Sequence, residues 1–297
     1  MKRFVKIALI VSAVLVVVGI AIVAVSLLMG GHISELRNSR MQIPAFFHSN
    51  NRATVTYNEY SKNNSYAVSS EGINTIQIDW ISGEVVVKIG EMDQITFSES
   101  GTGLTEETAL RYSVQGNTLD IQYCADRNFL NVNLPSKQLT LIVPSTLAAN
   151  LRELSAGTVS ANVTIDDPAF RIEELDFKTV SGNLDAVIAS AETAELETVS
   201  GTLCVIGGIN KFDAESVSGH ILLDCRNGAP RELDVETVSG NVTLQLPTDA
   251  DLTLEYETTS GDFDSALALG VHNGNYTIGT GRGEWEVETA SGDLTVK

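Results

Sequence analysis

The chain has 297 residues and a formal net charge of −19, and only 6% of its residues are aromatic. Residues 1–70 carry seven basic and two acidic residues, whereas residues 71–297 carry 12 basic and 36 acidic residues. An acidic domain repels phosphate backbones, so nucleic acid is excluded as a partner, and cations, basic peptides or a basic protein surface are better candidates. Solubility is the alternative reason for this charge.

Residues 7–29 form an uncharged run of 23 residues, IALIVSAVLVVVGIAIVAVSLLM. As a helix this run would be about 35 Å long, enough to cross a hydrocarbon core about 30 Å thick. The sequence therefore predicts one transmembrane helix that binds the chain to a membrane. The alternative is a cleaved secretory signal ending near Ala24-Val25-Ser26, but this run exceeds the roughly 7–15 apolar residues of a signal core and continues past the cut.

Basic residues on the two sides of this helix set the predicted topology. Lys2, Arg3 and Lys6 precede it, so the positive-inside rule makes residues 1–6 a short cytoplasmic tail and places the C-terminal domain outside the cytoplasm. Arg37 and Arg40 oppose this bias, which leaves a cytoplasmic domain as the alternative. We expect a single-pass protein of the cell membrane.

Two segments separate the predicted helix from the most informative part of the chain. Residues 30–70 mix Gly, Asn and Ser with isolated apolar residues, which is typical of a juxtamembrane linker. From residue 71, alternating runs such as INTIQIDW, GEVVVKIG and KQLTLIVP predict short strands. We expect these strands to be continuous with the C-terminal half of the chain, so that residues 71–297 form one domain, although a boundary at residues 144–150 is an alternative.

A short motif occurs six times in the last 119 residues. The copies are TVSGNL, TVSGTL, SVSGHI, TVSGNV, TTSGDF and TASGDL, and their glycines are Gly182, Gly201, Gly219, Gly240, Gly261 and Gly292. Ile81–Val85 and Ala156–Val159 resemble weaker copies. Repetition at intervals of about 20 residues indicates a stack of similar units.

Apolar residues stand seven and five positions before each repeat glycine and two positions after it. At the position two after the glycine, for example, the first four copies have Leu184, Leu203, Ile221 and Val242. This alternation points one face inward, so each unit reads as strand, Ser-Gly turn and strand, with glycine adopting a backbone conformation that a Cβ would disfavour. One unit cannot bury its apolar face alone. The sequence predicts an all-β, single-domain β-solenoid; a sheet of repeated hairpins is the alternative. The longer interval after Gly261 predicts an extra hairpin or cap, with Asn273-Gly274 as its turn.

The outward positions six and four before each glycine are acidic in every copy except at Lys178. In register, adjacent carboxylates would lie about 4.8 Å apart and repel each other by roughly 1 kcal/mol in water. This pattern predicts a ladder that binds divalent cations or a cationic ligand; a soluble, aggregation-resistant sheet surface is the alternative. The ladder comprises Asp176, Glu195, Glu197, Asp213, Glu215, Asp234, Glu236, Glu255, Glu257, Glu286 and Glu288.

The sequence offers no catalytic constellation. Asp262 and Asp264 are the nearest candidates for paired carboxylates, but both occupy ordinary repeat offsets. The glycines between Gly279 and Gly283 suit a hairpin loop better than a phosphate cradle. The three cysteines, Cys124, Cys204 and Cys225, show no metal-binding or disulfide spacing and suit buried thiols. We expect no enzyme and no resident cofactor.

The repeated T-[VTA]-S-G-[ND]-[LVF] signature, preceded by E-x-E/D alternation and the upstream run LTLIVP, resembles a bacterial β-strand-repeat family labelled "putative adhesin". The resemblance covers about residues 70–297. It implies a solenoid of unassigned function at the cell envelope, either an adhesin-like binding module or a scaffold partner of another membrane protein in envelope stress responses. It carries over no catalytic residues.

Overall fold

The computed structural model describes residues 64–124, 134–272 and 274–297. The predicted tail 1–6, the predicted membrane segment 7–29 and all of the predicted linker up to residue 63 lie outside these ranges. Among the residues described, no helix is long and apolar enough to cross a membrane.

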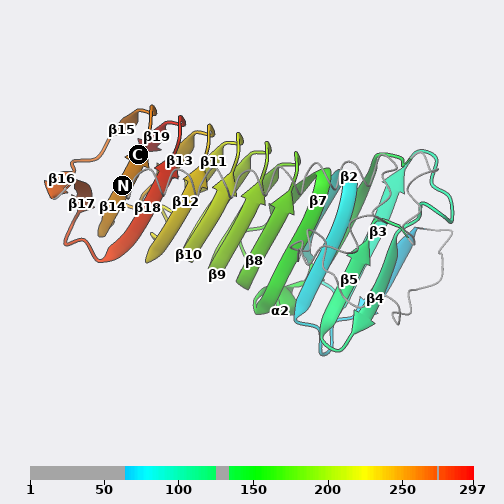
Figure 1. Cartoon of the computed structure of the whole chain (residues 1–297). Coiled ribbons are helices and arrows are strands. Elements are labelled where there is room, and N and C mark those ends of the chain that lie inside the picture. Colours follow the sequence, from blue (N-terminus) through cyan, green and yellow to red (C-terminus); the bar gives the residue numbers. More distant parts are fainter. Residues whose placement is uncertain (1–63, 125–133, 273) are drawn as a thin grey trace, which may run out of the picture.

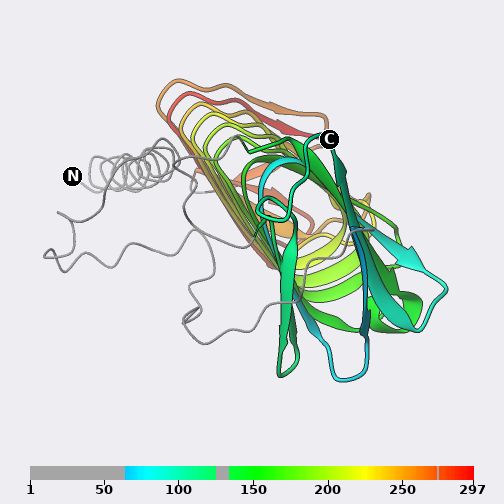
Figure 2. The same cartoon turned by 90° about the vertical axis from the view of Figure 1, so that its right-hand side faces the viewer.

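The strands form an elongated stack in which two sheet faces enclose the core (Figures 1 and 2). The first face, in spatial order, comprises β4 (Arg111–Gln115), β5 (Thr118–Gln122), β2 (Thr75–Gly90), β7 (Leu151–Asp166), β8 (Arg171–Thr179), β9 (Leu184–Thr198), β10 (Leu203–Ser216), β12 (Glu232–Thr237), β18 (Gly283–Thr289), β14 (Leu252–Thr258), β17 (Asn275–Ile278) and β16 (Gly270–His272).

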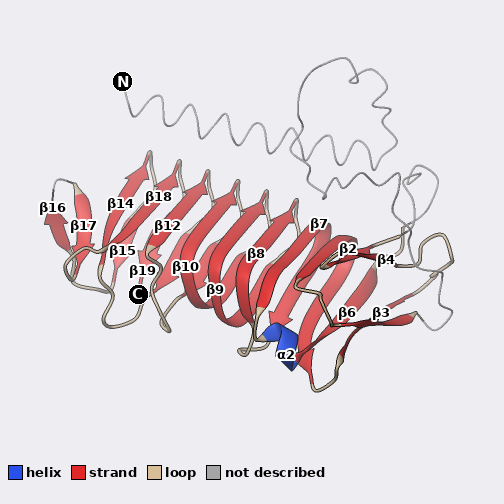
Figure 3. Ribbon diagram, turned by 90° about the horizontal axis from the view of Figure 1, so that it is seen from below, coloured by secondary structure: helices blue, strands red, loops and turns tan. Residues whose placement is uncertain are grey.

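The second face contains the shorter arms and the remaining halves of the long strands β2, β7, β9 and β10. In spatial order its other strands are β1 (Ser65–Ser69), β3 (Gln94–Gly101) and β6 (Lys137–Pro144) at one end, and β11 (Ile221–Asp224), β13 (Val242–Gln245), β19 (Leu294–Val296) and β15 (Phe263–Ser265) at the other. Each rung thus consists of an arm on the first face, a corner at the repeat glycine and an arm on the second face. Figure 3 shows the corners aligned along one edge of the stack.

Like positions of successive repeats lie side by side. Leu203 pairs with Leu184 and with Ile221, and Ile221 pairs in turn with Val242, all between parallel strands. Consecutive repeats in a sheet of hairpins would pair antiparallel, so this parallel register confirms the solenoid-like stack. Antiparallel pairing occurs only toward the two ends of the described stack, in pairs such as β4–β5 and β14–β17.

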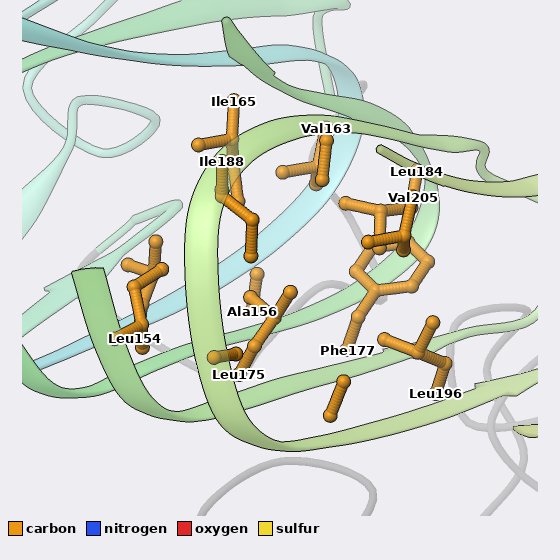
Figure 4. Packing of buried hydrophobic residues seen from close by; sticks show 14 of the residues in the cluster. Leu154, Ala156, Val163, Ile165, Leu175, Phe177, Leu184, Ile188, Leu196 and Val205 are labelled. Atoms are coloured by element: carbon orange, nitrogen blue, oxygen red, sulfur yellow. The ribbon is translucent and has the colours of Figure 1, made fainter. Parts of the chain in front are cut away.

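The predicted inward positions form the core. Leu175, Phe177 and Leu184 are each at most 1% exposed, and the corresponding residues of neighbouring rungs pack against them (Figure 4). Alternation along each arm therefore places one side chain in every two between the faces. The core continues without interruption into the N-terminal strands, where Ile76, Ile78 and other residues of β2 are buried.

The repeat glycines are required by close packing, not by an unusual backbone conformation, which corrects the sequence interpretation. None of the six is among the described residues with positive φ. A Cβ on Gly201 would instead lie 1.7 Å from the carbonyl oxygen of Gly182, and similar contacts of 1.9–2.0 Å occur at the other five. The weaker copy on β7 is also displaced from the predicted one: Gly182 packs over Ala161, so that copy is TVSANV at residues 158–163.

The order of rungs at the C-terminal end differs from the order of the sequence. β18 pairs with β12 on one side and with β14 on the other, and β19 likewise lies between β13 and β15. The last repeat is thus inserted before the fifth one. The extra hairpin expected after Gly261 is present as β16 and β17, at the left end of Figure 1, and it allows the chain to turn back.

The N-terminal end is closed in a similar way, because β2 lies between β7 and the later strands β5 and β6. Within this cap, the Nζ of Lys137 lies 2.7 Å from Glu99 Oε2 and donates hydrogen bonds to the carbonyl oxygens of Thr108 and Tyr123. Both side chains of the pair are fully buried, and Trp80 and Tyr123 present their rings to the ammonium group. Burial lowers the pKa of Lys137, an effect that Glu99 opposes.

Two local features refine the predicted segments. β1 begins at Ser65, inside the segment predicted as linker, and pairs with β3. Near residues 144–150 the chain forms the single-turn helix α2 (Ser145–Ala148). The sheet continues past α2, because β2 pairs with both β6 and β7.

Replacing Gly219 with alanine should destabilise the stack, because the new Cβ would lie 1.9 Å from the carbonyl oxygen of Gly201. Overpacking against backbone costs about 1–3 kcal/mol or more, so we expect a clearly lower melting temperature and urea midpoint. Gly208→Ala is the matched control, since its Cβ would meet its nearest atom at 3.6 Å. Equal losses in the two variants would refute the close-packing explanation.

Candidate functional site

The acidic ladder predicted from the sequence forms one continuous surface on the first face. We call this surface the acidic strip; it comprises the eleven carboxylates of the predicted ladder together with Lys178. The register of the strands arranges these residues in two columns. The first column is Asp176, Glu195, Asp213, Asp234, Glu286 and Glu255, and the second is Lys178, Glu197, Glu215, Glu236, Glu288 and Glu257.

The alternation of the strands produces this arrangement. In β12, for example, Leu233 and Val235 point into the core, so Asp234 and Glu236 must point outward. Because every pairing along the strip is parallel and in register, the same offset recurs on each neighbouring strand. The structure therefore brings together all the predicted residues, although β18 and β14 occur in the reverse of their expected order.

Two lysines pair with carboxylates in or beside the strip, Lys178 at its β8 end and Lys211 on β10. Lys178 Nζ lies 3.2 Å from Glu197 Oε1 and 3.8 Å from Asp176 Oδ1. Lys211, two residues before Asp213, lies 2.8 Å from Glu232. Burial alone would lower the pKa of Lys178, but the charges of Asp176 and Glu197 outweigh burial, so this pKa is raised.

The carboxyl groups in the middle of the strip have raised pKa values. Burial, followed by the charges of Glu215, Asp234, Glu288 and Asp213, raises the pKa of Glu236 to about 7. For the same reasons, burial first and neighbouring carboxylates second, the pKa values of Asp213, Glu215 and Asp234 are also raised. The strip therefore holds concentrated negative charge that an added cation would relieve.

The residues described contain no group of three or more His, Cys, Asp or Glu placed to hold a metal ion. The geometry explains this finding, because each strand contributes one carboxylate to each column and the columns extend along the sheet instead of converging. A divalent-cation site on the strip remains a prediction without a preformed ligand cluster.

A cleft of about 340 Å³ opens beside the strip at its C-terminal end. Glu232 and Glu284 lie directly opposite each other on β12 and β18, and Asn275 contributes from the hairpin. The remaining polar lining consists of Asp234, Glu286, Thr253 and Glu255. Sequence reasoning missed Glu232 and Glu284. The shared letters E-x-x-x-E-T in RELDVET and GEWEVET are a signal for them, but only the insertion of β18 makes them neighbours.

The other candidates from the sequence have structural roles or lie apart from the strip. Asp262, just before β15, and Asp264, within β15, are both exposed and lie beyond the corner from the first face. Asp251 accepts hydrogen bonds from the backbone N–H groups of Thr280 and Gly281, so the glycine-rich loop holds a carboxylate of its own chain as it leads into β18. All three cysteines are free; Cys124 and Cys225 are buried and Cys204 is half-buried.

The strip should make the folded protein less stable as the pH rises from about 4.5 to about 7. Glu236 has a folded-state pKa of about 7 against an ordinary value of 4.5, so between these values the folded state holds more protons than the unfolded state. We expect a higher melting temperature at pH 5 than at pH 8. Glu236→Gln should raise the melting temperature at pH 8 and so bring the two melting temperatures closer together. Glu71→Gln, on an exposed turn, is the control. A melting temperature that climbs from pH 5 to pH 8 would contradict this account.

Comparison with known proteins identifies the family of this chain. Residues 73–297 match the family described as Toastrack DUF4097. No curated protein matches the chain. Among solved structures, a "putative cell adhesion protein" from Clostridium sporogenes shares 14% identity with a TM-score of 0.37, covering 82% of this chain and 99% of that one. A "putative adhesin" from Bacteroides fragilis shares 13% identity with a TM-score of 0.38, covering 78% and 96%.

The family match extends over the whole described stack except β1, and it includes all six repeats and the strip. It confirms the resemblance found in the sequence. The chain belongs to the Toastrack DUF4097 family.

Proposed function

We propose that this protein is a non-enzymatic binding module of the cell envelope and that the acidic strip is its contact surface for a basic partner. The observation that carries the proposal is the unbroken register of outward carboxylates across six neighbouring strands. Like charges in a column repel each other in the isolated protein, and this repulsion adds to burial in raising the pKa of Glu236. A cationic partner would relieve this repulsion on binding.

The shape of the strip suits an extended ligand better than a single ion. Six strands at a spacing of about 4.8 Å give the strip a length of about 24 Å. Alternate side chains of an extended peptide lie about 6.6–6.8 Å apart, so several lysine or arginine side chains can reach the strip at once. The partner chemistry that we propose is therefore a basic segment or basic face of another protein.

Labelled decalysine added to the full-length protein in a mild detergent tests this proposal by fluorescence anisotropy. We expect binding that weakens as salt is added, because salt screens the attraction between charges at a surface that solvent reaches. Replacing Glu195, Glu197, Glu215 and Glu236 with glutamine should weaken binding about tenfold or more, since a surface ion pair contributes roughly 0.2–1 kcal/mol and the variant removes four of them.

The matched control changes net charge equally outside the strip, through Glu71→Gln, Glu91→Gln, Asp93→Asn and Glu106→Gln on exposed loops. Equal weakening by the two sets would show that only net charge matters and would sink the proposal. Failure to bind decalysine, combined with a higher melting temperature in millimolar calcium, would identify a metal ion as the ligand instead.

We also propose that residues 7–29 anchor the chain in the cell membrane and that the Toastrack domain lies outside the cytoplasm. The uncharged run of 23 residues and the preceding basic residues support this topology. Trypsin added to intact cells should therefore degrade the domain, while a cytoplasmic marker protein stays intact. Protection of the domain until the cells are lysed would contradict the proposed display.

Adhesion and scaffolding would use the same surface with different partners. An adhesin-like role requires a basic ligand outside the cell, whereas a scaffold role in envelope stress requires a basic face on a neighbouring membrane protein. Crosslinking in intact cells distinguishes them, because only the scaffold role gives crosslinks from the strip to a protein of the same membrane.

A further inference from the structure

We propose that the C-terminal rung of the stack, residues 252–265 of β14, β15 and the corner between them, accepts an extended basic segment of a partner protein as an added strand. This inference deepens the proposed function by assigning the partner a docking position at the end of the acidic strip. Three features of the rung carry it: an open strand edge, two core side chains that are only partly covered, and negative charge without a basic residue.

The edge of this rung is open in the part of the chain that the structure describes. Elsewhere on the first face, strands from β5 to β18 pair on both sides. β14 pairs with β18 along its whole length but with β17 only from Leu252 to Leu254. β15 forms a register only with β19 among the described strands. The outer edge from Glu255 onward can therefore accept a further strand.

Two core positions on this rung are only partly covered, whereas Leu252 and Leu254 are buried. Phe263 corresponds to Leu184, Leu203, Ile221, Val242 and Leu294, each at most 1% exposed, yet Phe263 itself is half-buried. Tyr256 is also half-buried, whereas its five equivalents, Phe177, Leu196, Ala214, Val235 and Val287, are at most 1% exposed.

These two rings belong to an aromatic cluster with Tyr276 of the hairpin. The ring centroids of Tyr256 and Phe263 are 5.5 Å apart, and those of Phe263 and Tyr276 are 4.4 Å apart. All three rings pack against the hydrophobic core. The strands that carry them, β14, β15 and β17, lie at the left of Figure 1. An added strand with apolar residues at alternate positions would complete the burial of Tyr256 and Phe263.

The charge of the rung indicates which residues the added strand needs at its outward positions. Residues 252–265 contain Glu255, Glu257, Asp262 and Asp264 and no lysine or arginine. Like charges directly opposite each other across a strand pair are destabilising, and opposite charges are stabilising. A strand that docks here therefore needs basic residues at its outward positions. The cleft beside Glu255 and Glu286 gives the basic side chains additional carboxylates to contact.

The same charge argues against a second copy of this chain as the occupant. Pairing of two C-terminal rungs would place eight carboxylates along one new interface without a basic residue from either rung. The observations therefore favour a heterologous segment in which apolar and basic residues alternate.

A peptide based on this rung supplies the probe. It has the sequence of residues 255–265, the part of the rung whose edge is open, with lysine at the positions of Glu255, Glu257, Asp262 and Asp264, so it keeps the strand pattern and reverses the charge. The control peptide has the same composition, with its four lysines gathered at one end. Binding of each labelled peptide to the full-length protein is measured by fluorescence anisotropy, and we expect the alternating peptide to bind at least tenfold more tightly than the control.

Two charge-reversal variants with equal net charge locate the contact. Glu255→Lys with Glu257→Lys at the end of the strip should abolish the preference for the alternating peptide. Glu195→Lys with Glu197→Lys in the middle of the strip should leave that preference within twofold. Melting temperatures verify that both variants remain folded, and Glu255→Gln with Glu257→Gln replaces the first variant if it does not fold.

The outcomes separate this inference from the proposed function. Equal binding of both peptides, or an equal loss in the two variants, would refute end docking while leaving the strip as a general basic-ligand surface. Binding of neither peptide nor decalysine would refute both. A dimer of the protein alone that the alternating peptide dissociates would show that the occupant is a second copy and would also overturn the inference.

Discussion

The contact between successive corners is the constraint on which the rest of the stack depends. At each corner the Cα of a repeat glycine lies over the carbonyl group of the corner before it, so closely that no Cβ fits. The residue three positions earlier fixes the same corner, as when the Thr179 hydroxyl accepts a hydrogen bond from the Gly182 N–H at 2.8 Å. An equivalent hydroxyl acts at every other repeat glycine. A corner built in this way permits one spacing and one register.

That register determines the interior and the surface together. Parallel, in-register strands place apolar side chains over apolar side chains, which produces a continuous core from units that are too small to have one. The same geometry places carboxylate over carboxylate on the outside, where burial and then the neighbouring carboxylates raise the pKa of Glu236. The core and the acidic strip are therefore two results of one backbone arrangement, and the burial of the core stabilises the strip against its own repulsion.

The ends of the stack show how a repetitive structure is terminated. At both ends a strand is inserted out of sequence order: β2 beside β7, and β18 between β12 and β14. At the N-terminal end, antiparallel strands and the buried Lys137–Glu99 pair close the core. At the C-terminal end, closure by the hairpin is partial, and Tyr256 and Phe263 stay half-exposed. This asymmetry makes the two ends chemically different although the rungs between them are alike.

The sequence by itself determined the elements that repeat. Alternation around Gly182 and its equivalents indicated the strands, their inward and outward sides and the members of the strip, because period-two patterning and a fixed glycine offset are local properties. The choice between a parallel stack and a sheet of hairpins came from the register of the strands in the structure. The sequence did not determine why glycine is required, because the close approach of the Gly182 and Gly201 backbones, 19 residues apart, leaves no local signal. For the same reason it did not reveal the buried Lys137–Glu99 pair, which joins residues 38 positions apart.

Only the tertiary structure decided the order of the last two repeats. TTSGDF and TASGDL carry the same pattern, so either could follow β12 and β13 in the stack. The insertion of β18 depends on the hairpin and on the loop that Asp251 holds, which are contacts between distant residues. It also brings Glu284 opposite Glu232 and leaves Tyr256 and Phe263 at the open end. Pairing between strands is a long-range choice, and equivalent sequence patterns cannot specify which of two equivalent strands is the neighbour.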